Sequence, residues 1–196
     1  MRKRFYKLIV TSFLAIGSLS AGASVVYVRA AGESGDGKSW NTAFTDLHQA
    51  LDASVVGDEI WIAEGLYKPV RIVDSRVANS RGFTIKDGVS IYGGFAGTET
   101  DRAQRELVAG GKPWEFVHET ILDGNDDVPD VWVREITPGT TYRHTWMKDD
   151  TNQIPGTDKN ATHLLYQSAR IVNHTVIDGL TVRGGNANAH LSLIHI

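Results

Sequence analysis

Residues 84–94 read TIKDGVSIYGG, and residues 175–185 read TVIDGLTVRGG. Both fit the pattern T-(I/V)-x-D-G-(V/L)-(S/T)-(I/V)-x-G-G, and a third, partial copy, TILDG, spans residues 120–124. A pattern that recurs after long gaps indicates stacked units, each of which buries its apolar side chains against its neighbours. The sequence therefore predicts a solenoid of structurally equivalent units rather than one closed globule.

The spacing of apolar residues inside the pattern indicates the kind of solenoid. Val89 and Ile91 flank Ser90, and residues 180–182 repeat this alternation. A period of two is typical of a strand, and the Asp-Gly and Gly-Gly pairs supply turns. We therefore expect an all-β protein, a parallel β-helix in which each coil pairs with the coils above and below. The expected turn residues are Asp87, Gly88, Gly93, Gly94, Asp123, Gly124, Asp178, Gly179, Gly184 and Gly185.

The first 23 residues have the layout of a secretory signal. Four basic residues within the first seven precede an apolar run at residues 8–16, and small residues follow at 21–23. We expect cleavage after Ala23 and a protein that is secreted or associated with the cell surface or outer membrane. The apolar run is too short for a typical span, so we expect no span in the mature chain; an uncleaved anchor is the alternative.

Composition excludes some classes of function. The chain has no cysteine, which excludes disulfides and thiol-based zinc or redox sites. Residues 1–23 carry four basic and no acidic side chains, so the rest of the chain has 16 basic and 23 acidic groups, a formal charge of −7. This charge argues against nucleic acid as a partner.

Residues 24–56 are expected to close the N-terminal end of the solenoid. Residues 25–28, VVYV, read as a short strand, and a short amphipathic α-helix is predicted within SWNTAFTDLHQALDAS at residues 39–54. Phe44, Leu47 and Leu51 recur there at helical spacing, with Asp46 near the helix start. Such a helix would cover the core and strand edges of the first coil.

Residues 57–190 are predicted to be the first coils of the solenoid. EIWIA at residues 59–63 reads as a strand, and LYKP at residues 66–69 is expected to lead outward from it. Residues 125–160 are too long for an ordinary connection and read as an insertion. The number of coils beyond this range is left open.

The last residues, LSLIHI at 191–196, match the translation of CTG TCT CTT ATA CAC ATC, which is the end of a transposase adapter used in library preparation. We expect this segment to be adapter-derived and the chain to be C-terminally truncated, an N-terminal fragment. The preceding repeat has only begun and no capping element follows it. The alternative is a genuine apolar strand at the end of a small protein.

Four segments together carry a family resemblance: SWNTAFTDLHQAL, GDEIWIAEGLYKP, GVSIYGGFAGTET and TVIDGLTVRGGNAN. The chain resembles secreted bacterial right-handed parallel β-helix proteins of the pectin-lyase-like superfamily, in particular surface proteins related to polymorphic outer-membrane proteins, including the choice-of-anchor Q group. The resemblance implies a right-handed coil and a surface location. In some members it also implies adhesion or contact with polysaccharide.

Two classes of function follow from this resemblance. The first is a noncatalytic extracellular or cell-surface module, adhesin-like or glycan-contacting, whose partners are polysaccharide or molecules on a host or neighbouring cell. The alternative is the N-terminal part of a polysaccharide lyase or glycoside hydrolase whose active coils lie beyond residue 190. We favour the first, because fold alone does not carry a reaction, and the catalytic residues are left unknown.

The aspartates of the pattern, Asp87, Asp123 and Asp178, are the most obvious candidates for acid–base chemistry. Each directly precedes a glycine, where an aspartate side chain commonly accepts hydrogen bonds from the backbone of a turn. We therefore interpret all three as structural. Glu99, Asp101, Arg102 and Arg105 could bind an acidic sugar, but on a surface loop we expect them to form ordinary exposed ion pairs.

An acidic cluster, DGNDDVPD, could hold calcium through closely spaced oxygen ligands. Its carboxylates are Asp123, Asp126, Asp127 and Asp130. The spacing is not that of an EF-hand, so a solvated loop is the alternative. Calcium is the only cofactor that the sequence suggests.

The insertion at residues 125–160 is the best binding candidate. It holds Trp132, Tyr142, His144 and Trp146. Aromatic side chains with polar neighbours suit stacking on sugar rings or binding a protein partner. The alternative is that Trp132 and Trp146 pack the insertion onto the coils.

Overall fold

The computed structural model describes residues 23–77, 79–125 and 160–185. Strands dominate this part of the chain, which contains a single α-helix. The strands are β1 (Val25–Val28), β2 (Glu59–Ala63), β3 (Gly65–Tyr67), β4 (Phe83–Ile85), β5 (Ser90–Phe95), β6 (Thr120–Asp123), β7 (Leu165–Gln167), β8 (Ile177–Asp178) and β9 (Leu180–Arg183). The helical elements are the 3₁₀ turns η1 (Trp40–Thr42) and η2 (Arg102–Gln104) and the helix α1 (Leu47–Ala53).

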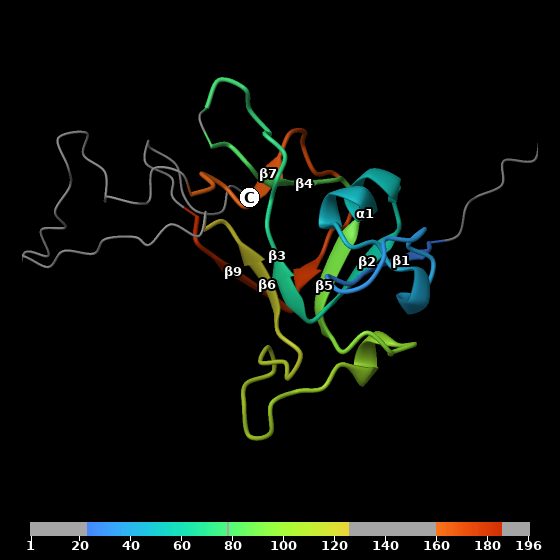
Figure 1. Ribbon diagram of the computed structural model, residues 1–196. Coiled ribbons are helices and arrows are strands. Elements are labelled where there is room, and N and C mark those ends of the chain that lie inside the picture. The colour runs from blue at the N-terminus through green and yellow to red at the C-terminus, as the bar shows by residue number, and fades with distance from the viewer. Residues whose placement is uncertain (1–22, 78, 126–159, 186–196) are drawn as a thin grey trace, which may run out of the picture.

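The strands form parallel sheets with the orders β1-β2-β5-β8, β3-β6-β9 and β4-β7. All of these pairings are parallel, and they join strands that lie far apart in the chain. In Figure 1 the sheets form three sides around a common interior, with α1 beside β4. The predicted all-β class is therefore confirmed.

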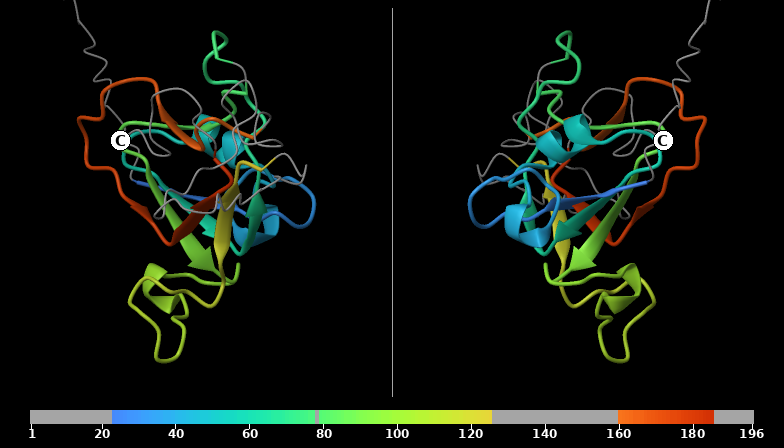
Figure 2. Two further views of the ribbon diagram at one scale, coloured as in Figure 1. Left: turned by 90° about the vertical axis from the view of Figure 1, so that its left-hand side faces the viewer. Right: turned by 90° about the vertical axis from the view of Figure 1, so that its right-hand side faces the viewer.

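The main hydrophobic core fills the space between the sheets and draws on all three of them and on α1. Val89 and Ile91 are 1 % exposed within this core, and residues Leu180 and Val182 pack against it. The inward alternation read from the sequence is correct at these positions. Figure 2 shows the interior from the two sides.

A second, aromatic cluster covers the other face of the first sheet. Tyr27, Trp61 and Tyr92 are neighbours across β1, β2 and β5. Trp61 stacks on Phe95 with ring centroids 4.8 Å apart, and the Trp40 indole N–H donates to the Glu99 carbonyl at 2.8 Å. Because this layer buries the outer face, every residue of β5 is buried. The strict inside–outside alternation expected from the sequence does not extend to this strand.

The free edge of β1 is closed by the loop that follows it. The backbone N–H of Tyr27 donates to the Gly37 carbonyl, and Phe44 exchanges backbone hydrogen bonds with Tyr27 and Arg29. Phe44 therefore lies in an extended segment bridged to β1, and its predicted place on the helix is wrong. The helix begins after Asp46, whose carboxylate accepts from the His48 N–H at 2.8 Å.

The three copies of the repeated pattern occupy three different places in the fold. Asp87–Gly88 joins β4 to β5, Asp123–Gly124 ends β6, and Asp178–Gly179 joins β8 to β9. In register, Ile91 pairs with Ile177, and Val182 pairs with Leu122. The prediction that the copies are structurally equivalent is wrong. Turns at different places in the fold use the same local Asp-Gly chemistry, so a shared sequence does not imply a shared position.

The connections between strands differ greatly in length. Gly65–Tyr67 does not lead outward as expected but forms β3, which pairs with β6. Longer connections leave the sheets between β3 and β4, at residues 68–77 and 79–82, and between β5 and β6, at residues 96–119, and Figure 1 shows both projecting. The sequence analysis singled out neither as an insertion.

Candidate ligand-binding site

Most of the binding residues predicted from the sequence lie outside the described part of the chain. These are Trp132, Tyr142, His144 and Trp146 of the aromatic set and Asp126, Asp127 and Asp130 of the acidic set. The two sets therefore remain predictions. Asp123, where the acidic set begins, is the member that the structure describes.

Asp123 joins neighbouring strands through its carboxylate. One oxygen accepts from the Asn125 N–H at 3.0 Å, and the other accepts from the Arg183 guanidinium at 3.1 and 3.2 Å. Its side chain is buried, whereas that of Arg183 is half exposed. Within residues 23–77, 79–125 and 160–185, no group of three acidic, histidine or cysteine side chains is placed to hold a metal ion.

The other two aspartates of the pattern have different partners. Asp87 accepts hydrogen bonds from the backbone N–H groups of Val172 and Asn173, at 2.8 and 2.7 Å. The hydrogen bond from the Asn173 N–H, with those from the Val172 N–H and the Asn173 side chain, outweighs desolvation and lowers the pKa of Asp87. Asp178 instead accepts from the Arg105 guanidinium at 2.8 Å.

Arg105 and Glu99 are not the exposed ion pairs that the sequence suggested. The Arg105 side chain is 13 % exposed, donates to the Gly93 carbonyl at 2.9 Å and lies 4.4 Å from the ring centre of Phe116. Glu99 is buried and accepts from the N–H groups of residues 96–98. Burial opposes its ionisation, but these N–H bonds outweigh burial and hold the pKa of Glu99 below its usual value.

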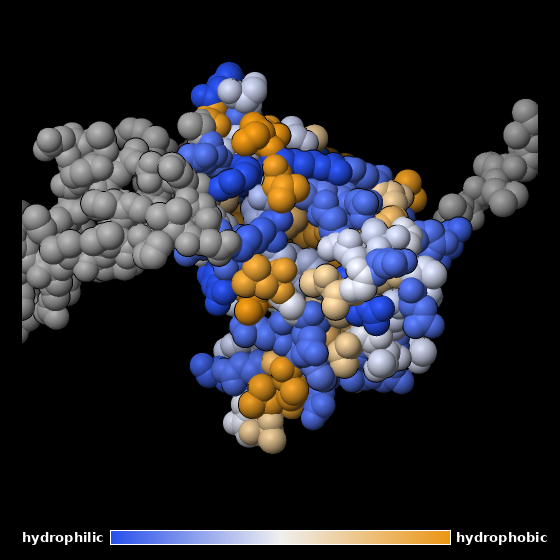
Figure 3. Space-filling model, viewed as in Figure 1, coloured by the Kyte–Doolittle hydropathy of each residue, from blue (hydrophilic) through white to orange (hydrophobic). Residues whose placement is uncertain are grey.

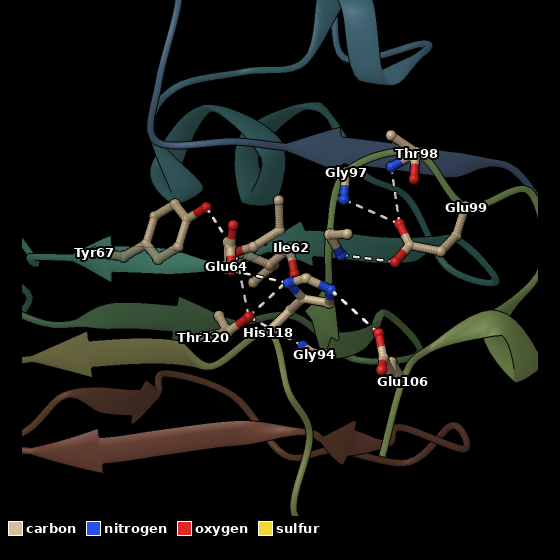
Figure 4. A network of polar contacts seen from close by, with 12 residues as sticks. Ile62, Glu64, Tyr67, Gly94, Gly97, Thr98, Glu99, Glu106, His118 and Thr120 are labelled. Atoms are coloured by element: carbon tan, nitrogen blue, oxygen red, sulfur yellow. Dashed lines mark hydrogen bonds and ion pairs between the residues drawn. The ribbon is translucent and has the colours of Figure 1, made fainter. Parts of the chain in front are cut away.

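Figure 4 shows a polar network at the turn between β2 and β3. The buried Thr120 hydroxyl donates to the carbonyls of Ile62 and Ala63, at 3.1 and 3.2 Å, and accepts from the Gly94 N–H at 3.0 Å. One side chain thereby links backbone groups of β2 and β5. This part of the network is structural.

His118 lies between two glutamates in the same view (Figure 4). Its Nδ1 lies 2.9 Å from a Glu64 carboxylate oxygen, and its Nε2 lies 3.9 Å from a Glu106 carboxylate oxygen. The two carboxylates lie beside opposite nitrogens of the imidazole ring, so they do not point toward one common metal position. The trio ties the segment that precedes β6 to the turn between β2 and β3.

The hollow with the chemistry of a binding site lies at the end of β6, where the chain leaves for residues 126–159. Its volume is about 290 Å³, and it is lined by Lys68, Pro69, Val70, Arg81, Asp123, Gly124 and Asn125. The Lys68 ammonium donates to the Asn125 carbonyl at 3.0 Å. Lys68, Arg81 and Asn125 each already have a partner within the protein, and the Asp123 carboxylate lines the same hollow. An ammonium and a guanidinium carry several N–H groups each, so they can also donate to a carboxylate or another anion.

Sequence reasoning missed Lys68 and Arg81. They lie 13 residues apart, on the two sides of the connection between β3 and β4, and Asn125 lies 57 residues beyond Lys68. No short motif joins such positions. The pairing of β3 with β6 brings Lys68 to Asn125. The only feature of the sequence that pointed to this region was the Asp-Gly pair at residues 123–124.

Comparisons of the chain with protein-family models, with curated proteins and with solved structures give no match. In the described part of the chain, no helix has both the length and the apolar character needed to cross a membrane. Function must therefore be argued from the residues themselves.

Proposed function

We propose that this chain is a noncatalytic extracellular or cell-surface module built as a right-handed parallel β-helix, and that it contacts polysaccharide. The parallel order β1-β2-β5-β8, with strands tens of residues apart in register, supports a coiled path around three sheets. Parallel crossovers within one sheet are almost always right-handed, which supports that hand. The secretory layout of residues 1–23 supports export.

The noncatalytic assignment rests on what the three aspartates of the repeated pattern bind. Asp87 binds backbone N–H groups, Asp123 binds Arg183 across a strand pair, and Asp178 binds Arg105. A general acid or base must reach a proton on the substrate, and an active site brings such groups together in one cleft. These three carboxylates lie at different turns and join neighbouring segments.

The hollow beside β6 gives the proposed contact its chemistry. Lys68 and Arg81 place an ammonium and a guanidinium on its wall, and Asn125 adds an amide. Guanidinium groups bind carboxylates through paired hydrogen bonds, so an acidic sugar such as a uronate unit is the class of ligand proposed.

Titration calorimetry of the protein with polygalacturonate, and with uncharged dextran as a second ligand, tests this proposal. Replacing Lys68 and Arg81 together by Gln is expected to weaken polygalacturonate binding about tenfold or more, since two charge-assisted contacts are lost. The matched control replaces Lys38 and Arg76, which are exposed elsewhere, and removes the same charge. It should change binding less than about twofold.

Equal weakening by the two double variants would refute the hollow as the site and leave only general charge attraction. Urea unfolding of each variant establishes that the fold survives, because Lys68 also holds the Asn125 carbonyl.

The catalytic alternative is tested separately from binding. Incubating the protein with acidic polysaccharides, with and without calcium, should release neither reducing ends nor the ultraviolet absorbance of unsaturated uronates. Turnover in either assay would overturn the noncatalytic assignment and favour a polysaccharide lyase or glycoside hydrolase, while leaving the contact at Lys68 and Arg81 as a separate question.

A further inference from the structure

Residues 106–117 form a β-hairpin in the connection between β5 and β6. Leu107 and Phe116 form an antiparallel bridge, the Val108 N–H donates to the Glu115 carbonyl, and the Val117 N–H donates to the Glu106 carbonyl, both at 2.8 Å. Figures 1 and 2 show this segment projecting from the sheets in each view. It is therefore a well-paired projection with solvent around its tip.

Apolar side chains gather on this hairpin, and no residue in the described part of the chain covers them. Leu107 is 48 % exposed, Val108 43 %, Trp114 65 % and Val117 46 %. Figure 3 shows the apolar patch at the lower tip of the molecule, apart from the rest of the surface. Contiguous exposed apolar residues on a monomer are typical of surfaces that meet a partner or a membrane.

The base of the hairpin is fixed to the sheets, so the apolar tip cannot fold back onto the core. Phe116 contacts Gly94, and the Arg105 guanidinium lies 4.4 Å from its ring centre. His118, directly after the hairpin, binds Glu64 at 2.9 Å. The structure therefore holds Trp114 and its apolar neighbours in an exposed position.

The arrangement of the apolar side chains favours a lipid partner over a protein partner. Leu107 and Val108 are consecutive in an extended ribbon, so their side chains leave opposite faces. A flat protein partner would cover one face of such a ribbon, whereas the boundary between lipid headgroups and acyl chains surrounds it on all sides. Tryptophan is the side chain most typical of that boundary.

The charges around the tip also fit a phospholipid. The tip carries one charge of each sign: Lys112, whose ammonium lies 5.4 Å from the Trp114 ring centre, and Glu115, whose carboxylate accepts from the Lys112 backbone N–H at 3.0 Å. A zwitterionic headgroup, as in phosphatidylcholine, has a partner for each of them. The acid at the base, Glu106, faces His118. A cation at the tip complements the phosphate of a headgroup, and the aliphatic stem of the lysine can lie in the apolar layer.

We propose that the hairpin at residues 106–117 inserts its tip into the headgroup region of a phospholipid bilayer. The proposal is independent of the polysaccharide site, which lies beside Lys68 and Arg81. Trp114, Leu107 and Val108 would enter the boundary with the acyl chains, with Lys112 at the level of the phosphates.

The test uses the full chain with phosphatidylcholine vesicles whose acyl chains are brominated and quench nearby tryptophans. The wild type should be quenched, and Trp114→Phe should remove most of the quenched emission while retaining binding. Leu107→Ser with Val108→Ser keeps the Trp114 reporter and should lower the partition coefficient about tenfold, since two apolar side chains no longer enter the boundary. Val55→Ser with Val56→Ser, at exposed sites elsewhere, should leave it unchanged.

Residues 8–16 are themselves apolar and could bind vesicles, so vesicle binding alone does not test the hairpin. Quenching of Trp114 tests it, because Trp114 lies at the tip. Binding without quenching at Trp114, or quenching unaffected by the Leu107 and Val108 substitutions, would overturn the proposal. Light scattering in the absence of lipid tests whether the tip binds a second copy of the chain. A dimer that the Leu107 and Val108 substitutions dissociate, together with no quenching by lipid, would show that it does and would overturn the lipid proposal.

Discussion

The turns Asp87–Gly88 and Asp178–Gly179 have the same two residues and nearly the same glycine conformation, with φ of 71° and 70°. Their surroundings differ. A Cβ on Gly88 would lie 2.7 Å from a methyl carbon of Val56, whereas one on Gly179 would lie 2.6 Å from the carbonyl oxygen of Gly93. Local sequence therefore sets the turn geometry, and the segments packed against each turn decide whether a larger side chain fits there.

Alanine at these two glycines gives the largest expected effect. Both substitutions introduce a left-handed alanine, at a cost of about 1–2 kcal/mol. Gly179→Ala also forces a methyl group against backbone, for a total destabilisation of about 3 kcal/mol or more. Gly88→Ala meets a side chain that can rotate, so its total should stay near about 2 kcal/mol. Urea unfolding measures both values.

A third variant separates the two terms of this comparison. Combining Gly88→Ala with Val56→Ala removes the side-chain contact and should recover part of the loss, leaving the backbone strain. Equal destabilisation by Gly88→Ala and Gly179→Ala would contradict the difference in packing between the two turns.

The ion pair at the second turn should contribute a smaller, pairwise energy. Arg105→Met, Asp178→Asn and the double variant form a cycle whose coupling energy is expected to be about 1 kcal/mol, because the Arg105 side chain is mostly buried. The exposed pair Lys38–Asp36, at 3.4 Å, serves as the control and should couple more weakly, because solvent screens both of its charges. A coupling no larger than that of the control would mean that Arg105 acts through Gly93 and Phe116 alone.

The first turn should contribute the smallest effect, visible as a pH dependence. Because the folded-state pKa of Asp87 lies below its unfolded value, its stabilisation is fully present above the unfolded pKa. It is lost as the pH falls through the folded pKa. The free energy of unfolding of the wild type should therefore fall on acidification below about pH 4.

Asp87→Ala should lower stability at neutral pH by less than either glycine substitution, because the N–H groups of Val172 and Asn173 lose their acceptor but can bind water at this exposed turn. It should also make the decline with acidification shallower. Glu99 and Asp58 have lowered pKa values for similar reasons, with burial opposed by backbone hydrogen bonds, and their part of the decline should remain in this variant. An unchanged pH profile would show that Asp87 does not contribute in this way.

Much of the fold could be read from local patterns. The strands at residues 25–28 and 59–63 and the helix that begins after Asp46 were predicted from apolar spacing and from one capping carboxylate. Gly93 and Gly94 were predicted to form a turn, and this is wrong, because both lie inside β5, where the pairing with β2 shifts register. The outer aromatic layer was not, since Tyr27, Trp61 and Tyr92 become neighbours only through strand pairing. The hollow lined by Lys68 and Arg81 was missed for the same reason.

The sequence by itself determined that the chain makes short strands separated by left-handed glycine turns, because side-chain alternation and Asp-Gly chemistry act within a few residues. Only the tertiary structure decided which turn each Asp-Gly pair occupies and which strand lies beside which. Those choices depend on pairing and packing between segments tens of residues apart, as between Ile91 and Ile177, and no local pattern encodes them.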